Sequence, residues 1–218
     1  MSNKIKFIYI IITVLIVLLC VSSYMFFKKV GLNDVNEKSI EKSTRYSPEI
    51  GSSDSKNLVI EFMDFKCPYC KKFEFTSYIK LKNKYIAKGN VKFRVINASI
   101  LGNDSIKASR AAHALNIYYP KRYWQFHHKL LKMQPNHENE WITTKLIDTE
   151  LEKLDIPKSK LRLIKNDYKK EGSKSWNLAK KDKELYKKYN NDYVPSIYVN
   201  GKFIKDPYSL KEIEKYMN

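Results

Sequence analysis

The sequence contains few cysteines, glycines and prolines. Its 218 residues include three Cys, six Gly and seven Pro. Three cysteines are too few for a small disulfide-stapled protein, and so little Gly and Pro excludes a collagen-like fibre. A hydrophobic fraction of 43%, with 13% aromatic residues, excludes global disorder because such a chain can bury a core. The length predicts one compact domain, with or without an anchor, and excludes a large multidomain machine.

Acidic residues are scarce relative to basic ones. The chain has 41 Lys and Arg against 23 Asp and Glu, a formal net charge of +18. Such a charge indicates attraction to polyanions, so a non-enzymatic protein that binds nucleic acid or wall polyanions is one function class to weigh. The basic residues are dispersed along the chain, as on a solvated face, and no nucleic-acid motif is present. We therefore expect no nucleic-acid partner.

One long stretch carries no charge. Residues 7–27 read FIYIIITVLIVLLCVSSYMFF and have two Lys close by on each side. A helix of this length spans roughly 31 Å at about 1.5 Å per residue, enough to cross the hydrocarbon of a membrane. The sequence predicts a cytoplasmic end at residues 1–6, a single-pass transmembrane anchor and an extracytoplasmic remainder. The alternative is a secreted protein with a cleaved signal peptide, since Val21-Ser22-Ser23 offers small residues for cleavage.

The rest of the chain divides by its apolar pattern. Residues 28–56 lack a sustained apolar period and end in a Gly-Ser cluster, so we predict a flexible stalk with a mean reach of roughly 30 Å. Residues 57–104 and 191–218 are predicted to form an α/β domain. Residues 105–190 follow the period of helices and are predicted to form a helical insertion within that domain.

The predicted α/β domain begins with a strand, a C-x-x-C motif and a helix. Residues 57–65, NLVIEFMDF, are apolar on both faces except at two acids, which is typical of a central buried strand. The motif Cys67-Pro68-Tyr69-Cys70 follows directly, and a helical stripe runs from it to Gly89-Asn90. Three further elements are predicted: a strand at residues 91–100, a hairpin at 196–204 with its turn at Asn200-Gly201, and a helix at 208–217.

The position of the motif predicts redox chemistry. Because Cys67 falls where the strand gives way to the helix, its sulfur can accept free backbone N–H groups and lies at the positive end of the helix dipole. Both effects lower a thiol pKa from its free value of about 8.5, and the thiolate is the nucleophile. Cys70 lies one turn later on the same face, close enough to bond to Cys67. We predict that Cys67 is the nucleophile, that Cys70 is the resolving thiol, and that no cofactor is needed beyond their redox-active disulfide.

Two alternative uses of the pair lack support from the rest of the chain. A zinc site would need two further Cys or His ligands, but there is no second C-x-x-C and the four His fall in the predicted insertion, so no metal is predicted. A purely structural disulfide would close only a short ring and would stabilise little. His127 and His128 lie in an amphipathic stretch, and we expect one to face the core and the other solvent, without a ligand role.

Three stretches together resemble the DsbA-like branch of the thioredoxin superfamily, the exported thiol:disulfide oxidoreductases. They are EFMDFKCPYC from Glu61, YWQFHHKLLKMQ in the predicted insertion, and VPSIYVNG from Val194. C-P-Y-C alone also resembles glutaredoxins, but these are much smaller and lack an insertion of this size. The resemblance implies a thioredoxin fold with a helical domain inserted between the βαβ unit and the hairpin. It also implies an enzyme that acts on exported proteins with free thiols and is reoxidised by a quinone-linked membrane thiol oxidase.

The resemblance also implies a substrate-binding loop. Val194-Pro195 matches the family's cis-proline loop, in which the residue before the proline offers its backbone to an extended substrate beside the disulfide. Pro68 and Tyr69 are expected to bind substrate from the other side. The alternative is an ordinary trans proline that opens a strand. Many members have Gly-Thr before this proline, so Tyr193-Val194 in this chain leaves the substrate preference and redox poise open.

Glu61 corresponds in this resemblance to the buried acid beneath the disulfide. A desolvated carboxyl group of raised pKa could shuttle the proton of Cys70. A solvated glutamate at a strand edge is the alternative. The direction of exchange depends on potential and partner, so a reductase or isomerase of the same fold remains the alternative to an oxidase.

Overall fold

The computed structural model describes residues 3–29, 34–137 and 139–218, and the chain divides into two units, Met1–Asp34 and Val35–Asn218. The first unit contains helix α1 (Asn3–Lys29). Among the described residues, no helix combines the length and the apolar character needed to cross a membrane. The predicted transmembrane anchor is therefore not confirmed and stays a prediction. Parts of three predicted segments lie outside the described residues: 1–2 of the cytoplasmic end, 30–33 of the stalk and 138 of the helical insertion.

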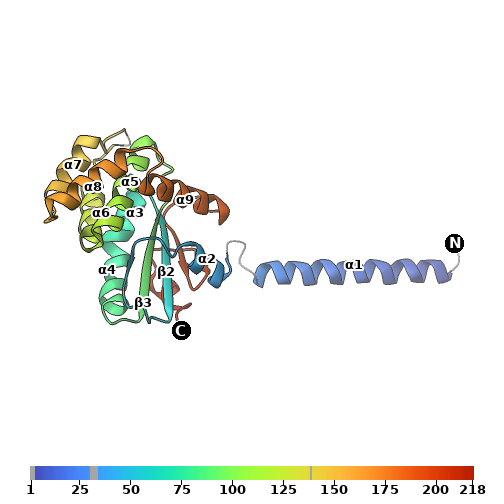
Figure 1. Ribbon diagram of the computed structural model, residues 1–218. Helices are drawn as coiled ribbons and strands as arrows, with labels where there is room; N and C mark the ends of the chain where they lie inside the picture. Colours follow the sequence, from blue (N-terminus) through green and yellow to red (C-terminus); the bar gives the residue numbers. More distant parts are fainter. Residues whose placement is uncertain (1–2, 30–33, 138) are drawn as a thin grey trace. The chain divides into compact units, whose positions relative to one another are not determined.

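The second unit is built on a five-stranded mixed sheet in the order β1-β3-β2-β4-β5 (Figure 1). β2 (Asn57–Met63) is central and buried along its whole length, as its apolar sequence predicted. It pairs in parallel with β3 (Val91–Asn97) and antiparallel with β4 (Ser196–Val199). β5 (Lys202–Ile204) completes the hairpin, and the predicted turn at Asn200-Gly201 is confirmed.

The chain between β2 and β3 is a helical segment that begins at the C-x-x-C motif. It contains α3 (Pro68–Phe73), the π-helical η1 (Glu74–Tyr78), α4 (Ile79–Leu81) and the π-helical η2 (Lys82–Ile86). Gly89 then adopts a φ of 77° shortly after the helix ends. Strand, helix and parallel strand form the predicted βαβ unit, which places the motif at the end of the central strand.

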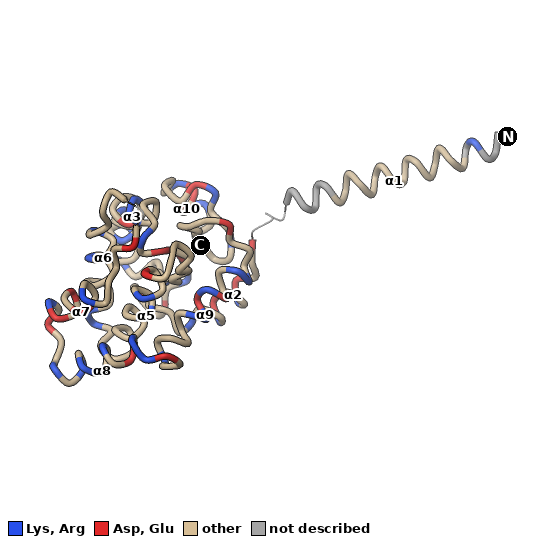
Figure 2. The backbone as a smooth tube through the Cα atoms, turned by 90° about the horizontal axis from the view of Figure 1, so that it is seen from above, with Lys and Arg blue, Asp and Glu red and all other residues tan. Residues whose placement is uncertain are grey.

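The chain between β3 and β4 forms helices that cover the sheet. They are α5 (Asn103–Tyr118), the short 3₁₀ helix η3 (Pro120–Arg122), α6 (Tyr123–Lys132), α7 (Thr144–Glu152), α8 (Lys158–Lys169) and α9 (Lys174–Lys188). α5 packs against both α8 and α9, as the view in Figure 2 shows. These helices belong to the same compact unit as the sheet. The chain ends with α10 (Leu210–Glu214), within the stretch where a last helix was predicted.

Residues 35–56 fold against the sheet, and the prediction of a flexible stalk was wrong for this stretch. Helix α2 (Glu37–Ser43) places Ile40 in the core with no exposed surface. β1 (Glu49–Ile50) pairs with the edge of β3, and Arg94 of β3 forms an ion pair with Glu49. The sequence did not reveal this because one buried isoleucine and a two-residue strand produce no apolar period.

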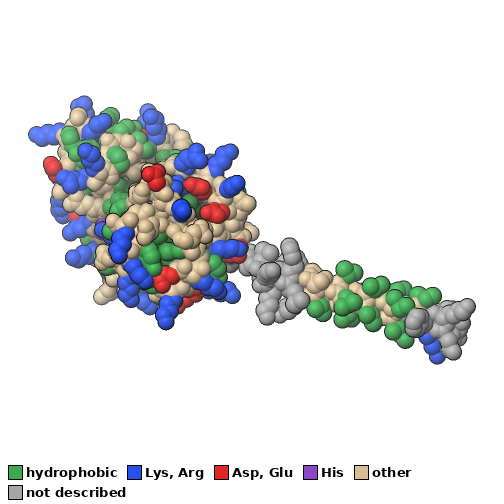
Figure 3. Space-filling view, turned by 90° about the horizontal axis from the view of Figure 1, so that it is seen from below, with side chains coloured by type: hydrophobic (Ala, Val, Ile, Leu, Met, Phe, Trp, Pro, Cys, Tyr) green, Lys and Arg blue, Asp and Glu red, His purple; other side chains and the backbone are tan. Residues whose placement is uncertain are grey.

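The basic side chains of the folded unit are dispersed. Figure 3 shows Lys and Arg spread over the face in view, with acidic groups between them. Several lysines form ion pairs with acids, among them Lys84 with Glu214 and Lys169 with Asp148. On the face in view, this distribution matches the solvated face expected from the sequence.

Candidate active site

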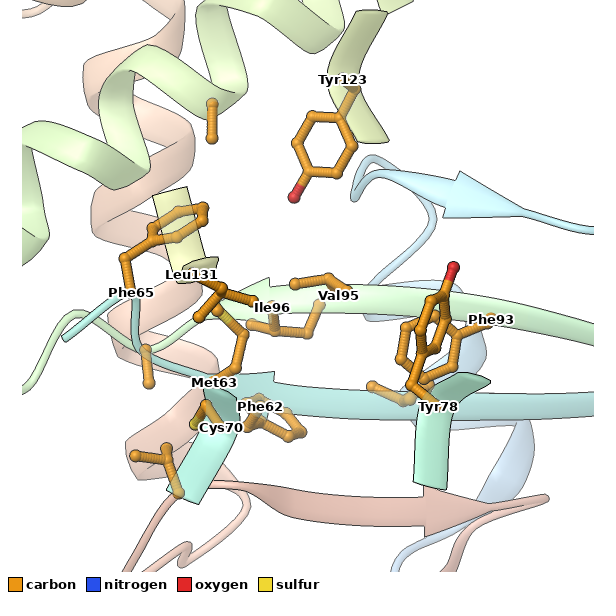
Figure 4. Close-up of a cluster of buried hydrophobic side chains, with 14 of the residues drawn as sticks. Phe62, Met63, Phe65, Cys70, Tyr78, Phe93, Val95, Ile96, Tyr123 and Leu131 are labelled. Atoms are coloured by element: carbon orange, nitrogen blue, oxygen red, sulfur yellow. The ribbon is translucent and has the colours of Figure 1, made fainter. Parts of the chain in front are cut away.

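Cys67 occupies the N-cap of α3, immediately beyond the central strand. Its Sγ accepts a hydrogen bond from the backbone N–H of Cys70 at 3.4 Å. Pro68 stands in the first turn, where its missing N–H costs nothing. Both cysteines are free thiols in the structure, and both are buried. Cys70 lies deeper, in the hydrophobic cluster drawn in Figure 4, together with Phe62 and Met63 of β2.

The surroundings move the pKa values of the two thiols apart. The hydrogen bond from the Cys70 thiol lowers the pKa of Cys67, against the effect of burial, and the backbone N–H groups of Cys70 and Tyr69 lower it further. Burial raises the pKa of Cys70 well above its ordinary value, and negative charge on Cys67 and Glu61 adds to this rise. Cys67 is therefore the thiol that ionises first.

Glu61 lies on β2 with only 2% of its surface exposed, which excludes the solvated alternative. Burial raises the pKa of its carboxyl group well above the ordinary value, and negative charge on Glu74 and Cys67 acts in the same direction. A carboxyl group held in its protonated form can donate a proton to a neighbouring thiolate. Its charge acts in turn on the pKa of Cys70, which links the two groups electrostatically.

The loop before β4 meets the motif from the other side. The Val194–Pro195 peptide bond is cis, which excludes the alternative of a trans proline at this position. The Cys67 thiol donates a hydrogen bond to the Val194 carbonyl oxygen, with 3.3 Å between sulfur and oxygen. The fold thus brings together two segments that lie 127 positions apart in the chain.

An open groove of about 410 Å³ lies beside the motif. Its lining includes Cys67, Pro68, Tyr69 and Val194, together with Ile100, Leu101, Tyr193, Lys66 and Asp192. Tyr69 and Tyr193 are exposed, at 63% and 46%. The structure therefore gathers three of the residues predicted to bind substrate around one groove, and the fourth, Pro195, follows Val194 directly.

A family model described as thioredoxin matches residues 43–218. The chain belongs to the thioredoxin family. Disulfide bond formation protein D of Bacillus subtilis is 35% identical over 179 residues, which cover 80% of this chain and 77% of that protein. Probable disulfide bond formation protein D of Bacillus anthracis is 31% identical over 189 residues, which cover 83% of each chain.

Solved structures similar to this chain point to the same family. The crystal structure of oxidised BdbD from Bacillus subtilis is 34% identical, with a TM-score of 0.72, and the match covers 78% of this chain and 90% of that one. The thiol-disulfide exchange protein alpha-DsbA2 of Wolbachia pipientis shares the fold at 22% identity and a TM-score of 0.64, covering 82% of this chain and 93% of that one. The chain is a DsbA-like member of the thioredoxin superfamily.

Sequence reasoning missed several polar residues that support the motif in this DsbA-like fold. The side-chain amide of Gln134 donates hydrogen bonds to the carbonyls of Phe65 and Cys67 at 2.7 and 3.1 Å. Lys66 forms a buried ion pair with Asp104 at 3.0 Å. No local pattern marks these partners, because each pair is separated by more than thirty positions. Gln134 does end the stretch YWQFHHKLLKMQ that carried the family resemblance, and that was the available signal.

Glu74, one turn beyond Cys70, was also missed. It is buried against His127 and His128 of α6, of which His127 is fully buried and His128 partly exposed, much as predicted. Burial alone would raise the pKa of Glu74, but its contacts with the two imidazoles outweigh that effect and lower the pKa to about 2. Burial lowers the pKa of His127, which favours its neutral form.

Proposed function

We propose that this chain introduces disulfides into exported proteins by thiol–disulfide exchange at Cys67 and Cys70. The observation that carries the proposal is that the start of α3 and the cis-proline loop meet at one sulfur atom, that of Cys67. Cys67 caps a helix, which lowers its pKa, and the same thiol bonds to the cis-proline loop beside an open groove. The relatives named disulfide bond formation proteins support the direction of the reaction.

The reaction starts with Cys67 and Cys70 joined as a disulfide. A substrate thiolate attacks the Cys67 sulfur, the bond between the two cysteines breaks, and Cys70 leaves and takes a proton. A second thiolate of the substrate then attacks the substrate sulfur of this mixed disulfide, and Cys67 leaves as a thiolate. The substrate has lost two electrons and gained a disulfide, and the chain holds a dithiol. The lowered pKa of Cys67 makes it a good leaving group in this second step.

Glu61 is proposed as the proton donor to Cys70. The thiolate of Cys70 would be formed in a buried site, where a charge is costly. A carboxyl group that burial keeps protonated is suited to deliver a proton there and to regain it from solvent. Its part in catalysis is that of a buried acid that acts on the leaving group.

Val194 is proposed to hold the substrate backbone. In the dithiol state its carbonyl oxygen accepts a hydrogen bond from the Cys67 thiol. When Cys67 is bonded to a substrate sulfur, the thiol proton is gone, and the carbonyl oxygen can accept a hydrogen bond from an N–H group of the bound peptide instead. Pro68, Tyr69 and Pro195 would shape the groove around it, and main-chain recognition of this kind tolerates many sequences.

The setting we propose is the extracytoplasmic face of the cell membrane. The absence of charge in residues 7–27 supports a membrane anchor there, and a cleaved signal peptide is the alternative. A quinone-linked membrane thiol oxidase is the proposed reoxidising partner, because each turnover leaves the chain as a dithiol that must pass two electrons on.

Mixed-disulfide trapping tests the function. With Cys70→Ser, Cys67 has no internal partner, so mixed disulfides with exported proteins should accumulate on non-reducing gels. Cys20→Ser is the matched control and should trap nothing. If the Cys70→Ser chain folds and captures no protein, the proposed function is wrong.

The reductase or isomerase alternative is tested by equilibrium with glutathione. An oxidase should have a reduction potential well above the value of about −270 mV found for thioredoxin. A potential close to that of thioredoxin would favour the alternative and contradict the proposed direction.

A further inference from the structure

Three potential metal ligands meet between the helix of the C-x-x-C motif and α6. Glu74 opens the π-helical segment η1, and His127 and His128 are successive residues of α6. Side-chain exposure is 3% for Glu74, none for His127 and 30% for His128. None of the three residues lines the groove beside Cys67, although the charge of Glu74 contributes to the raised pKa of Glu61.

The donor atoms have the spacing of a metal site. One ligand atom from each residue lies within 4.8 Å of the other two. The distance from His127 Nε2 to Glu74 Oε2 is 3.5 Å, and His128 Nδ1 lies against Glu74 Oε1. Ligands of a tetrahedral zinc ion with bonds of about 2.1 Å are about 3.4 Å apart, close to the distance between His127 Nε2 and Glu74 Oε2.

The two histidines can reach one point although they are neighbours in sequence. Successive residues of a helix point about 100° apart, so identical donor atoms would diverge. His127 offers its distant Nε2, whereas His128 offers its near Nδ1. The two rings are nearly perpendicular, at 79°, with centroids 5.7 Å apart.

These donor atoms contact one another but form no hydrogen bond of good geometry. Within the described part of the chain, Glu74 Oε2, both ring nitrogens of His127 and His128 Nδ1 are buried without a hydrogen bond of good geometry. Buried polar atoms that make no hydrogen bond are costly and call for an explanation. A cation placed among them would accept a lone pair from each of the three side chains.

The ligand set and its access both fit a transition metal. Two imidazoles and one carboxylate bind zinc and related ions at sites that keep one position open. A pocket of about 390 Å³, lined by His128, Phe75 and Glu150 among others, opens beside one of the three residues. Glu74 also begins a π-helical turn, an irregularity that is frequent at functional sites.

We propose that Glu74, His127 and His128 bind one divalent transition-metal ion of the zinc class. The three side chains supply three ligands, and water from the pocket supplies the fourth. The site joins the helix of the motif to α6, so the bound ion stabilises the packing of the helices against the βαβ unit. This proposal does not depend on the proposed disulfide chemistry.

The test is a titration of the full chain with Zn²⁺ alone. The chain carries Cys20→Ser, is purified in detergent, stripped with a chelator and kept oxidised so that no thiol competes for the metal. Calorimetry should show one ion per chain, and Co²⁺ should give the visible absorption of a four-coordinate site. Zn²⁺ should also raise the melting temperature, because an ion that binds only the folded state stabilises it.

Variants locate the site. His128→Ala and Glu74→Gln should each weaken Zn²⁺ binding by about 100-fold, since even outer-shell partners of a metal contribute 10–100-fold. His137→Ala removes an exposed histidine outside the cluster and should bind as the parent does. The proposal is overturned if the parent chain binds no ion and its melting temperature is unchanged by Zn²⁺. It is overturned equally if both cluster variants bind like the parent, or if His137→Ala abolishes binding.

Discussion

Replacing Ile40 by alanine tests whether α2 is an integral part of the fold. Ile40 is the one residue of this seven-residue helix that enters the core, and it has no exposed surface. Truncating a fully buried isoleucine to alanine costs about 2–5 kcal/mol, depending on how far the site collapses. Because α2 is short, its neighbours can close part of the cavity. We expect Ile40→Ala to lower the free energy of unfolding by about 2–3 kcal/mol.

The assay is urea unfolding of the oxidised full chain, followed by tryptophan fluorescence. Lys38→Ala is the matched control, because Lys38 lies in the same helix and is exposed. The control should stay within about 0.5 kcal/mol of the parent. Equal stabilities of the two variants would mean that α2 does not pack against the sheet and that residues 35–56 form a tether after all.

Two further predictions concern single residues. In the oxidised chain, stability should fall as pH rises above about 4.3, because Glu61 ionises there when unfolded but stays protonated when folded. Glu61→Gln should remove this fall, and unchanged pH dependence of urea unfolding would contradict the raised pKa. Gly201→Ala should destabilise by about 1–3 kcal/mol, since Gly201 has a φ of 80° and an added Cβ would lie 2.5 Å from the Val35 carbonyl. A parental melting temperature would refute it.

Much of the central fold could be predicted from the sequence. The run from Asn57 to Phe65 predicted a doubly covered strand, since a strand buried on both faces has no polar alternation. Asn200-Gly201 predicted the hairpin, because both residues accept the positive φ that the turn requires. The helix dipole argument placed Cys67 at a helix start, where it caps α3.

The elements at the edge of the sheet, β1 and α2, could not be predicted from the sequence. β1 has two residues, and α2 buries one side chain, so neither produces a periodic signal. Their stability comes from long-range contacts such as the ion pair of Arg94 with Glu49 and the backbone bond from Val35 to Gly201. Such contacts exist only once the sheet has formed.

The candidate site also has a part that could be predicted from the sequence and a part that could not. The two cysteines are three positions apart, so local reasoning could assign their relative roles. The contact of Cys67 with Val194 spans the whole helical region, and only the family resemblance pointed to it before the structure did. Glu74 and the two histidines of α6 had no sequence signal, because an acid on one helix and imidazoles on another form a pattern only in three dimensions.

The central claim is that the fold makes Cys67 unusually acidic. The most direct measurement is a pH titration of the reduced chain, with thiolate formation at Cys67 followed by ultraviolet absorbance and Cys67→Ser as the blank. We predict that Cys67 ionises below the value of about 8.5 for a free cysteine, while Cys70 stays protonated. A Cys67 thiol that titrates at or above the value of free cysteine would contradict the account.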